Sequence, residues 1–70
     1  MRYSIECEQE TDGRWLAEVP ELPGVMAYGD TRQQAQSKVE ALALRVLAEQ
    51  LENDECPPRS IHIELATVLT

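Results

Sequence analysis

The chain has 70 residues, enough for one domain with a small core. It carries 13 acidic and 6 basic residues, a net charge of −7 and a pI near 4.4. This charge disfavours nucleic-acid binding through phosphate neutralisation, and it suits either a basic protein partner or solubility alone. A core of this size rarely provides more than about 3–5 kcal/mol, so we also expect self-association or a partner chain.

The start of the chain and its cysteines indicate a compartment. Met1 leads directly into a strand-like pattern, and no apolar run approaches the ~20 residues of a membrane span, so we expect neither a signal peptide nor membrane insertion. We interpret Cys7 and Cys56 as reduced thiols of a cytoplasmic protein and leave open whether they ever pair. Together with His62 they are too few for a zinc site, so we predict no metal and no cofactor.

The first part of the chain predicts a β-hairpin. Polar and apolar side chains alternate over residues 2–8, with the odd-numbered residues on the core face. Asp12-Gly13 is a hairpin signal, because glycine supplies the positive φ that the turn needs. The return strand over 14–19 places Trp15 on the core face as the main core aromatic, with ligand binding by Trp15 as the alternative.

Prolines and glycines then divide the chain into short elements. Pro20 cannot donate to a β-ladder and should end the return strand. Pro23 and Gly24 fit the two central positions of a type II turn, since proline fixes φ and glycine takes the positive φ. Residues 25–28 predict a short third strand that ends at Gly29.

A long helix follows over residues 32–51. Thr31 is the predicted N-cap, and Gln34 completes a T-x-x-Q capping box. No glycine or proline interrupts the segment, and good helix formers dominate it. One apolar stripe should face the core; it comprises Ala35, Val39, Leu42, Ala43, Val46 and Leu47.

A second, smaller apolar stripe lies on the opposite side of this helix, where a single sheet-packed helix is usually polar. Leu44 and Leu51 form it, with Ala41 and Ala48 beside them. We interpret it as a patch that meets another chain, with ordinary surface exposure as the alternative. The candidate contact residues are Leu44, Leu51, Glu40 and Glu52.

The last part of the chain predicts a fourth strand. Residues 53–58 contain two adjacent prolines and end the helix, and apolar residues alternate over 61–65. Val68 and Leu69 lie out of phase with that core face, which indicates a bulge or an interface. The predicted fold is α+β in the order β-β-β-α-β: a three-stranded antiparallel meander, one long helix and a fourth strand.

No catalytic constellation emerges from the residue pattern. Cys7 and His62 fall on opposite faces of their strands, so a buried structural thiol is favoured over a Cys-His pair. Glu6, Glu18 and Glu64 are interpreted as a solvated acidic face rather than as groups for acid–base or magnesium chemistry. We predict that the protein is not an enzyme.

The ordered spacing of the turn signals resembles a known family. Residues 12–24 read Asp-Gly-Arg-Trp-Leu-Ala-Glu-Val-Pro-Glu-Leu-Pro-Gly, and Gly29-Asp30-Thr31 then precedes a helix that opens with Gln34-Ala35. This pattern is similar to that of HicB antitoxins over residues 3–58, and it suggests a single HicB-like domain over 1–70. The signature positions are Gly13, Pro20, Pro23, Gly24, Gly29 and Thr31.

The resemblance implies a fold and a function. HicB domains resemble a degraded ribonuclease H fold without its metal-binding carboxylates, and they bind small basic HicA-type toxins that cleave messenger RNA. Many members also carry a C-terminal DNA-binding domain, but this chain stops at Thr70, so we expect no direct DNA binding. Two alternatives remain open: a structural homo-oligomeric module, and a residual ribonuclease H-like hydrolase.

Overall fold

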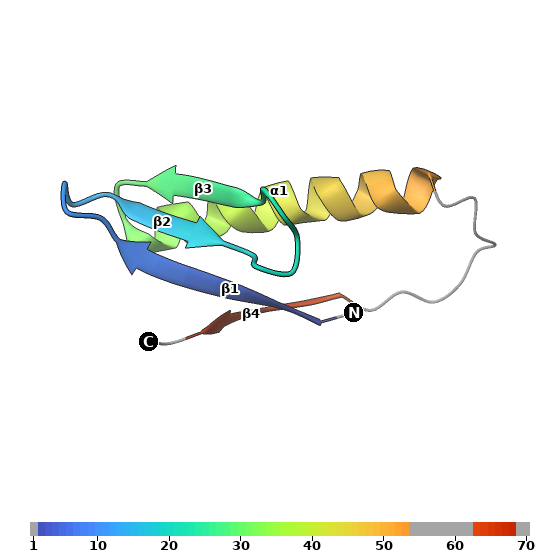
Figure 1. The fold of residues 1–70 in the computed structure, drawn as a ribbon, viewed down its shortest axis with the longest axis horizontal. Helices are drawn as coiled ribbons and strands as arrows, with labels where there is room; N and C mark the ends of the chain where they lie inside the picture. The colour runs from blue at the N-terminus through green and yellow to red at the C-terminus, as the bar shows by residue number, and fades with distance from the viewer. Residues whose placement is uncertain (1, 54–62, 69–70) are drawn as a thin grey trace.

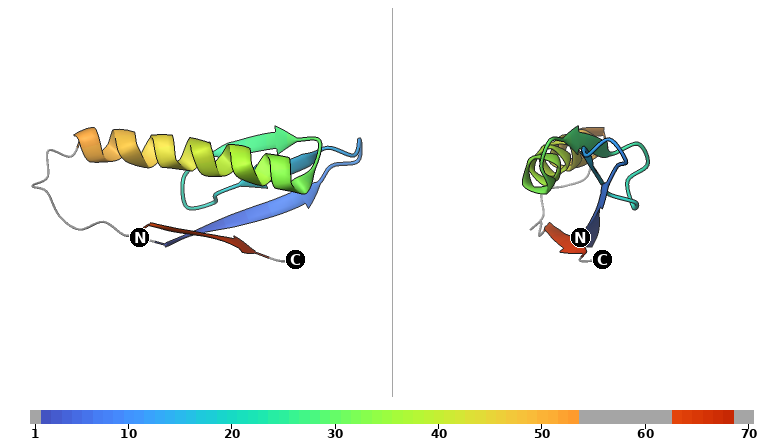
Figure 2. Two further views of the ribbon diagram at one scale, coloured as in Figure 1. Left: turned by 180° about the vertical axis from the view of Figure 1, so that it is seen from behind. Right: turned by 90° about the vertical axis from the view of Figure 1, so that its left-hand side faces the viewer.

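The computed structural model describes residues 2–53 and 63–68 and has an α+β architecture (Figure 1). One long helix packs along one face of a four-stranded sheet, as the two opposite views in Figures 1 and 2 show. The elements are β1 (Arg2–Gln9), β2 (Trp15–Glu18), β3 (Met26–Gly29), α1 (Arg32–Asn53) and β4 (Glu64–Val68). The predicted fold class, its single helix and its four strands are confirmed.

Strands β1, β2 and β3 form the predicted antiparallel meander, but the position and direction of β4 differ from an all-antiparallel sheet. The sheet is mixed, with the order β3-β2-β1-β4, because β4 pairs in parallel with β1. The reason is directional: α1 runs back along the sheet after β3, so the strand that follows α1 runs in the same direction as β1. Moreover, β2 pairs only with residues 6–9 of β1, and β4 pairs with residues 2–6. The ribonuclease H-like resemblance stays a prediction.

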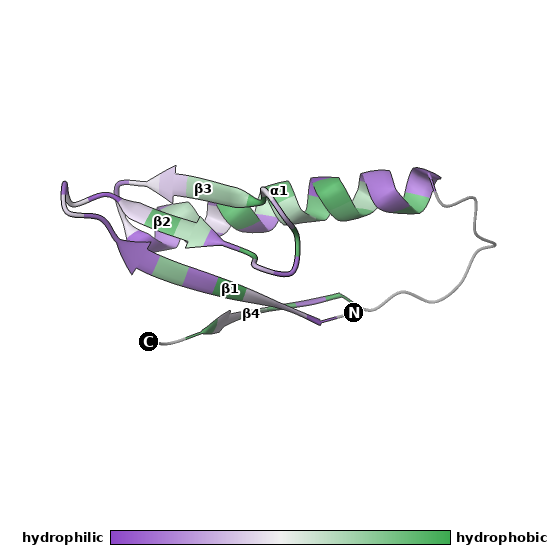
Figure 3. Ribbon diagram, in the orientation of Figure 1, coloured by the Kyte–Doolittle hydropathy of each residue, from purple (hydrophilic) through white to green (hydrophobic). Residues whose placement is uncertain are grey.

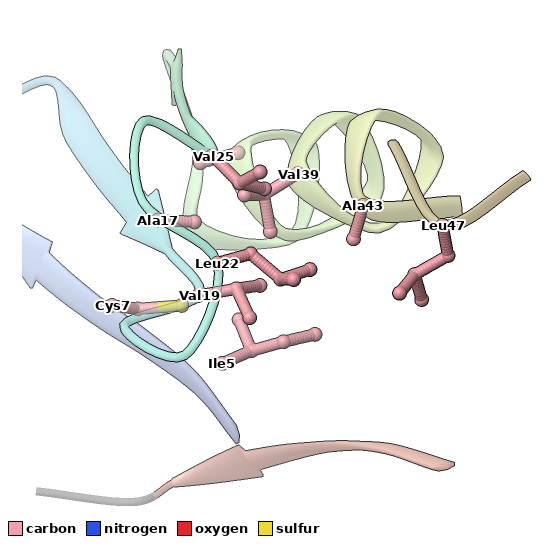
Figure 4. Packing of buried hydrophobic residues seen from close by; sticks show 10 residues of the cluster. Ile5, Cys7, Ala17, Val19, Leu22, Val25, Val39, Ala43 and Leu47 are labelled. Atoms are coloured by element: carbon pink, nitrogen blue, oxygen red, sulfur yellow. The ribbon is translucent and has the colours of Figure 1, made fainter. Parts of the chain in front are cut away.

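The core lies between α1 and the inner face of the sheet (Figure 4). The predicted core stripe of α1 is confirmed, with Leu42 and Val46 partly buried at its margin. Trp15 is also only partly buried at the edge of this cluster, and the guanidinium of Arg32 lies 5.8 Å from the centre of its ring. The buried hydrophobic residues are Ile5, Cys7, Ala17, Val19, Leu22, Val25, Ala35, Val39, Ala43 and Leu47.

Several of the predicted turn signals are confirmed in detail. Gly13 and Gly24 have φ values of 95° and 82°. The Val25 N–H donates to the Leu22 carbonyl at 3.1 Å, which is the hydrogen bond expected when Pro23 and Gly24 occupy the centre of a type II turn. The glycines are therefore required by backbone conformation at these two turns.

The start of α1 is capped by its own side chains. The Gln34 N–H donates to Thr31 Oγ1 at 3.1 Å, so Thr31 is the N-cap as predicted. The Gln34 side chain reaches back and accepts a hydrogen bond at 2.7 Å from the N–H of Asp30, one residue before the cap. The N–H of Gln34 in the first turn of the helix thus obtains a partner from an uncharged side chain.

Two strands lie further along the chain than predicted. The third strand begins at Met26, because Val25 belongs to the turn and is buried. The fourth strand spans Glu64–Val68, whereas predicted residues 61 and 62, together with Cys56 and Leu69, lie outside the described residues. Val68 is out of phase with the core, as predicted: it is 39% exposed on the outer face beside Glu6.

Glu21 binds β1 beyond the point where β1 stops pairing with β2. The last pair between these strands in this direction is Glu6 with Glu18, and Pro20 follows shortly after in the chain. The Glu21 carboxylate accepts hydrogen bonds from the Ser4 N–H at 3.0 Å and from the Ser4 hydroxyl at 3.0 Å. The loop between β2 and β3 is thereby attached to β1.

Gly29 should not tolerate a side chain. A Cβ at this position would lie 2.5 Å from the Ala35 backbone nitrogen, so α1 would have to shift away from the end of β3. We expect Gly29→Ala to lower the free energy of unfolding by about 1–3 kcal/mol in urea titrations. Ser37→Ala is the control, because Ser37 is exposed on α1 and an exposed substitution of this kind should change the free energy of unfolding by no more than about 0.5 kcal/mol. Equal urea midpoints for wild type and Gly29→Ala would contradict this account.

Glu21 should make stability depend on pH. Hydrogen bonds from its own backbone N–H, and from the hydroxyl and N–H of Ser4, lower the pKa of Glu21 below its ordinary value of 4.5. A depressed folded-state pKa stabilises the fold above 4.5, and this contribution disappears as pH falls through the folded pKa. Wild type should therefore exceed Glu21→Gln in unfolding free energy at about pH 6, and the difference should vanish in acid. An unchanged difference between the two proteins from pH 6 into acid would contradict this account.

Candidate protein-binding face

The face of the sheet opposite α1 is uncovered, and its middle is acidic. Alternation along β1 directs Ile5 and Cys7 toward the helix and Glu6 and Glu8 away from it, as the alternating colours along β1 in Figure 3 illustrate. Residues paired across strands share a face, so the register defines this surface. The open face comprises Arg2, Ser4, Glu6, Glu8, Leu16, Glu18, Met26, Tyr28, Glu64, Ala66 and Val68.

Two carboxylates lie directly opposite each other at its centre. Glu6 on β1 pairs with Glu18 on β2. The Glu10 N–H donates to the Arg14 carbonyl at 2.7 Å, and alternation from that pair makes Glu6 and Glu18 a hydrogen-bonded pair as well. Their Cα atoms are therefore about 5.5 Å apart. Like charges in this position destabilise a sheet.

Arg2 and Arg14, the arginines on this side of the molecule, form ion pairs with carboxylates other than Glu6, Glu8 and Glu18. Arg2 forms an ion pair with Glu64 at 3.0 Å, and Arg14 forms one with Asp12 at 2.9 Å. Within residues 2–53 and 63–68, neither arginine forms an ion pair with Glu6, Glu8 or Glu18. Hydrogen bonds from Arg14, first from its backbone N–H and then from its side chain, lower the pKa of Asp12 below 3.8.

The acidic centre surrounds a small hollow with a volume of about 250 Å³. Glu6, Cys7, Glu8, Leu16 and Glu18 line it. Small-molecule sites usually enclose about 300–1,000 Å³ and are mostly apolar. The hollow is small and partly carboxylate-lined, so it fits a protruding side chain of a protein better than a whole ligand.

Apolar side chains border the acidic centre on both sides. Met26 and Tyr28 on β3 are 46% and 42% exposed, and Val68 on β4 is 39% exposed. The guanidinium of Arg14 lies 4.7 Å from the centre of the Tyr28 ring. An apolar border around a charged centre combines burial with charge complementarity, the two features that protein interfaces use.

The predicted contact residues lie on α1, away from this face. Leu44 is 48% exposed and Glu52 is exposed, whereas Leu51 and Glu40 are partly buried. They form a separate surface, and the structure does not bring them together with the acidic centre. The sequence pattern predicted that Glu18 lies on a solvated face, but it did not predict that Met26 and Tyr28 are exposed beside it. The signal that could have predicted this exposure is the alternation of side chains along the third strand, which contains no charged residue.

The carboxylates do not converge on a common point in the described part of the chain. Glu64 is paired with Arg2 near the other end of β1, away from the Glu6–Glu18 pair. Residues 2–53 and 63–68 contain no group of three or more histidine, cysteine or acidic side chains that could hold a metal ion. Cys7 is a buried free thiol, and His62 lies outside the described residues.

Comparison of the chain with protein-family models, with curated proteins and with solved structures found no match. The resemblance to HicB antitoxins therefore stays a prediction that depends on the turn pattern over residues 12–35. Among the described residues, no helix combines the length and the apolar character needed to cross a membrane.

Neutralising the central pair should stabilise the fold. Glu18→Gln removes the repulsion from Glu6, and we expect the free energy of unfolding to rise by about 0.2–1 kcal/mol at low salt. The gain should shrink in high salt, because salt screens exposed charges. Glu49→Gln removes an exposed carboxylate from α1 and serves as the control. Equal stabilisation by the two variants in urea titrations would show that net charge, not the pair, is responsible.

Proposed function

We propose that this protein is a non-catalytic, antitoxin-like protein that binds and occludes a small basic HicA-type toxin in a type II toxin–antitoxin pair. The observation that carries the proposal is the pair of directly opposed carboxylates, Glu6 and Glu18, on an uncovered sheet face with an apolar border. The turn pattern shared with HicB antitoxins adds the identity of the partner class.

A basic partner would resolve the charge conflict on this face. An arginine or lysine inserted between Glu6 and Glu18 would convert a repulsive pair into a charge-assisted hydrogen-bonded cluster. Met26, Tyr28 and Val68 would then exclude water around it, which strengthens the ionic contacts. The net charge of −7 would accelerate the encounter with a basic protein.

Inhibition would follow from competition for one surface. A toxin that cleaves messenger RNA must present a basic face to the phosphates of its substrate. A carboxylate-rich sheet face offers the same basic groups an alternative partner, so bound antitoxin covers the RNA-binding face and the catalytic histidine of the toxin. No residue of this chain takes part in a reaction. The proposal places the complex in the cytoplasm and assigns the chain a degraded ribonuclease H-like fold.

Purified complexes provide the test. The proposal predicts that a gene next to that of this chain encodes a small basic protein, which should co-purify with the chain and lose its RNA-cleaving activity in the complex. The double variant Glu6→Gln/Glu18→Gln should raise the Kd of the complex at least about tenfold, equivalent to 1.4 kcal/mol. Calorimetry and an RNA-cleavage assay measure the two effects.

A matched variant separates the two candidate surfaces. Glu40→Gln/Glu52→Gln also removes two negative charges, but from α1. It should leave the Kd within about threefold of wild type, as expected for charges outside the contact. Stronger weakening by the α1 variant would move the binding site to the helix. Failure of the neighbouring basic protein to bind at all would overturn the proposed function.

A further inference from the structure

The β3 strand forms one edge of the sheet, and within residues 2–53 and 63–68 no strand pairs with its outer side. β3 lies at the end of the strand order, with β2 as its only neighbour in the described sheet. The Val19 N–H donates to the Val25 carbonyl at 3.0 Å. Alternation from that pair directs Ala27 and Gly29 toward β2, and it directs the N–H and C=O groups of Met26 and Tyr28 outward.

This edge lacks the protection that edge strands usually have. Residues 22–29 are all uncharged, in a chain in which 27% of residues are charged. Within β3 there is no proline or lysine to discourage pairing. The strand is short, and Asp30 and Lys38 line a hollow together with Tyr28 and Gly29 at its end. Met26 and Tyr28, whose backbone groups point outward, also have two of the most exposed large apolar side chains among the described residues.

We infer that a second copy of this chain pairs with the first through β3, antiparallel, around a two-fold axis at Ala27. In this register Met26 of each copy lies opposite Tyr28 of the other, and their outward N–H and C=O groups bond reciprocally. On the open face the Met26 sulfur meets the Tyr28 ring, a favourable contact. The inner face at the axis carries the small Ala27 side chains, and α1 of each copy packs over its own β3 on that side.

Charge complementarity between the two copies favours pairing at this edge. Two chains of −7 repel each other, but β3 itself is uncharged, and Arg14 lies over the Tyr28 ring with its guanidinium 4.7 Å from the ring centre. Glu18 is the β2 neighbour of Met26. Pairing Met26 with Tyr28 therefore carries Arg14 of each copy to within about two strand spacings, ~10 Å, of Glu18 of the other. The two-fold axis produces this attraction twice.

Cross-linking tests the register directly. At the axis the two Ala27 residues form a non-hydrogen-bonded pair, with Cα atoms about 4.5 Å apart and within disulfide range. In a Cys7→Ala/Cys56→Ser background, Ala27→Cys should form a disulfide-linked dimer under mild oxidation, seen on non-reducing gels. Leu44→Cys in the same background is the control, and it should stay monomeric. A monomeric Ala27→Cys protein, or equally fast cross-linking of Leu44→Cys, would overturn the proposed interface.

Removal of one outward N–H tests the strand pairing. Met26→Pro deletes an N–H that β2 does not use, so the fold should persist by circular dichroism. Sedimentation equilibrium should give wild type and Met26→Val twice the 7.9 kDa chain mass at micromolar concentration, and Met26→Pro the single mass. A monomeric wild type, or a folded Met26→Pro protein that dimerises like wild type, would overturn the inference. The cross-link decides the question if Met26→Pro does not fold.

Discussion

The register of β1 is the constraint on which the rest of the structure depends. Its first half pairs with β4 and its second half with β2, so one strand aligns both neighbours. The same alternation sends Ile5 and Cys7 into the core and Glu6 and Glu8 to the open face. A slip of one residue would exchange these two sets of side chains. The core and the acidic face are therefore specified by a single pairing.

The open face breaks local rules that the rest of the chain follows. In the rest of the chain, the core positions are apolar, α1 is capped and the turns carry the glycines that their backbone angles need. By contrast, Glu6 faces Glu18 in the ladder, and large apolar side chains remain exposed beside them. Natural sequences tend to depart from such rules where a functional surface requires it. The binding role proposed for this face explains why both departures occur together.

Elements governed by neighbours in sequence were predictable. The N-cap at Thr31, the type II turn at Pro23 and Gly24, and the core stripe of α1 depend on interactions across three or four residues. The exposure of Met26 and Tyr28 was not predictable, because it depends on β3 lying at the edge of the sheet. For the helix surface around Leu44, the sequence likewise predicted an apolar patch but could not identify a partner for it.

Residue order by itself determined an α+β domain, the positions of its turns, the faces of its first two strands and an acidic character, because these follow from local periodicity, backbone conformation and composition. Only the tertiary structure decided that β4 joins β1 in parallel and that the sheet is mixed. It also decided that Glu6 and Glu18 oppose each other and that β3 lies at one edge of the sheet formed by the described residues. Strand pairing joins residues far apart in the chain, and it depends on which hydrogen-bonding edge is free and on the direction in which the helix returns.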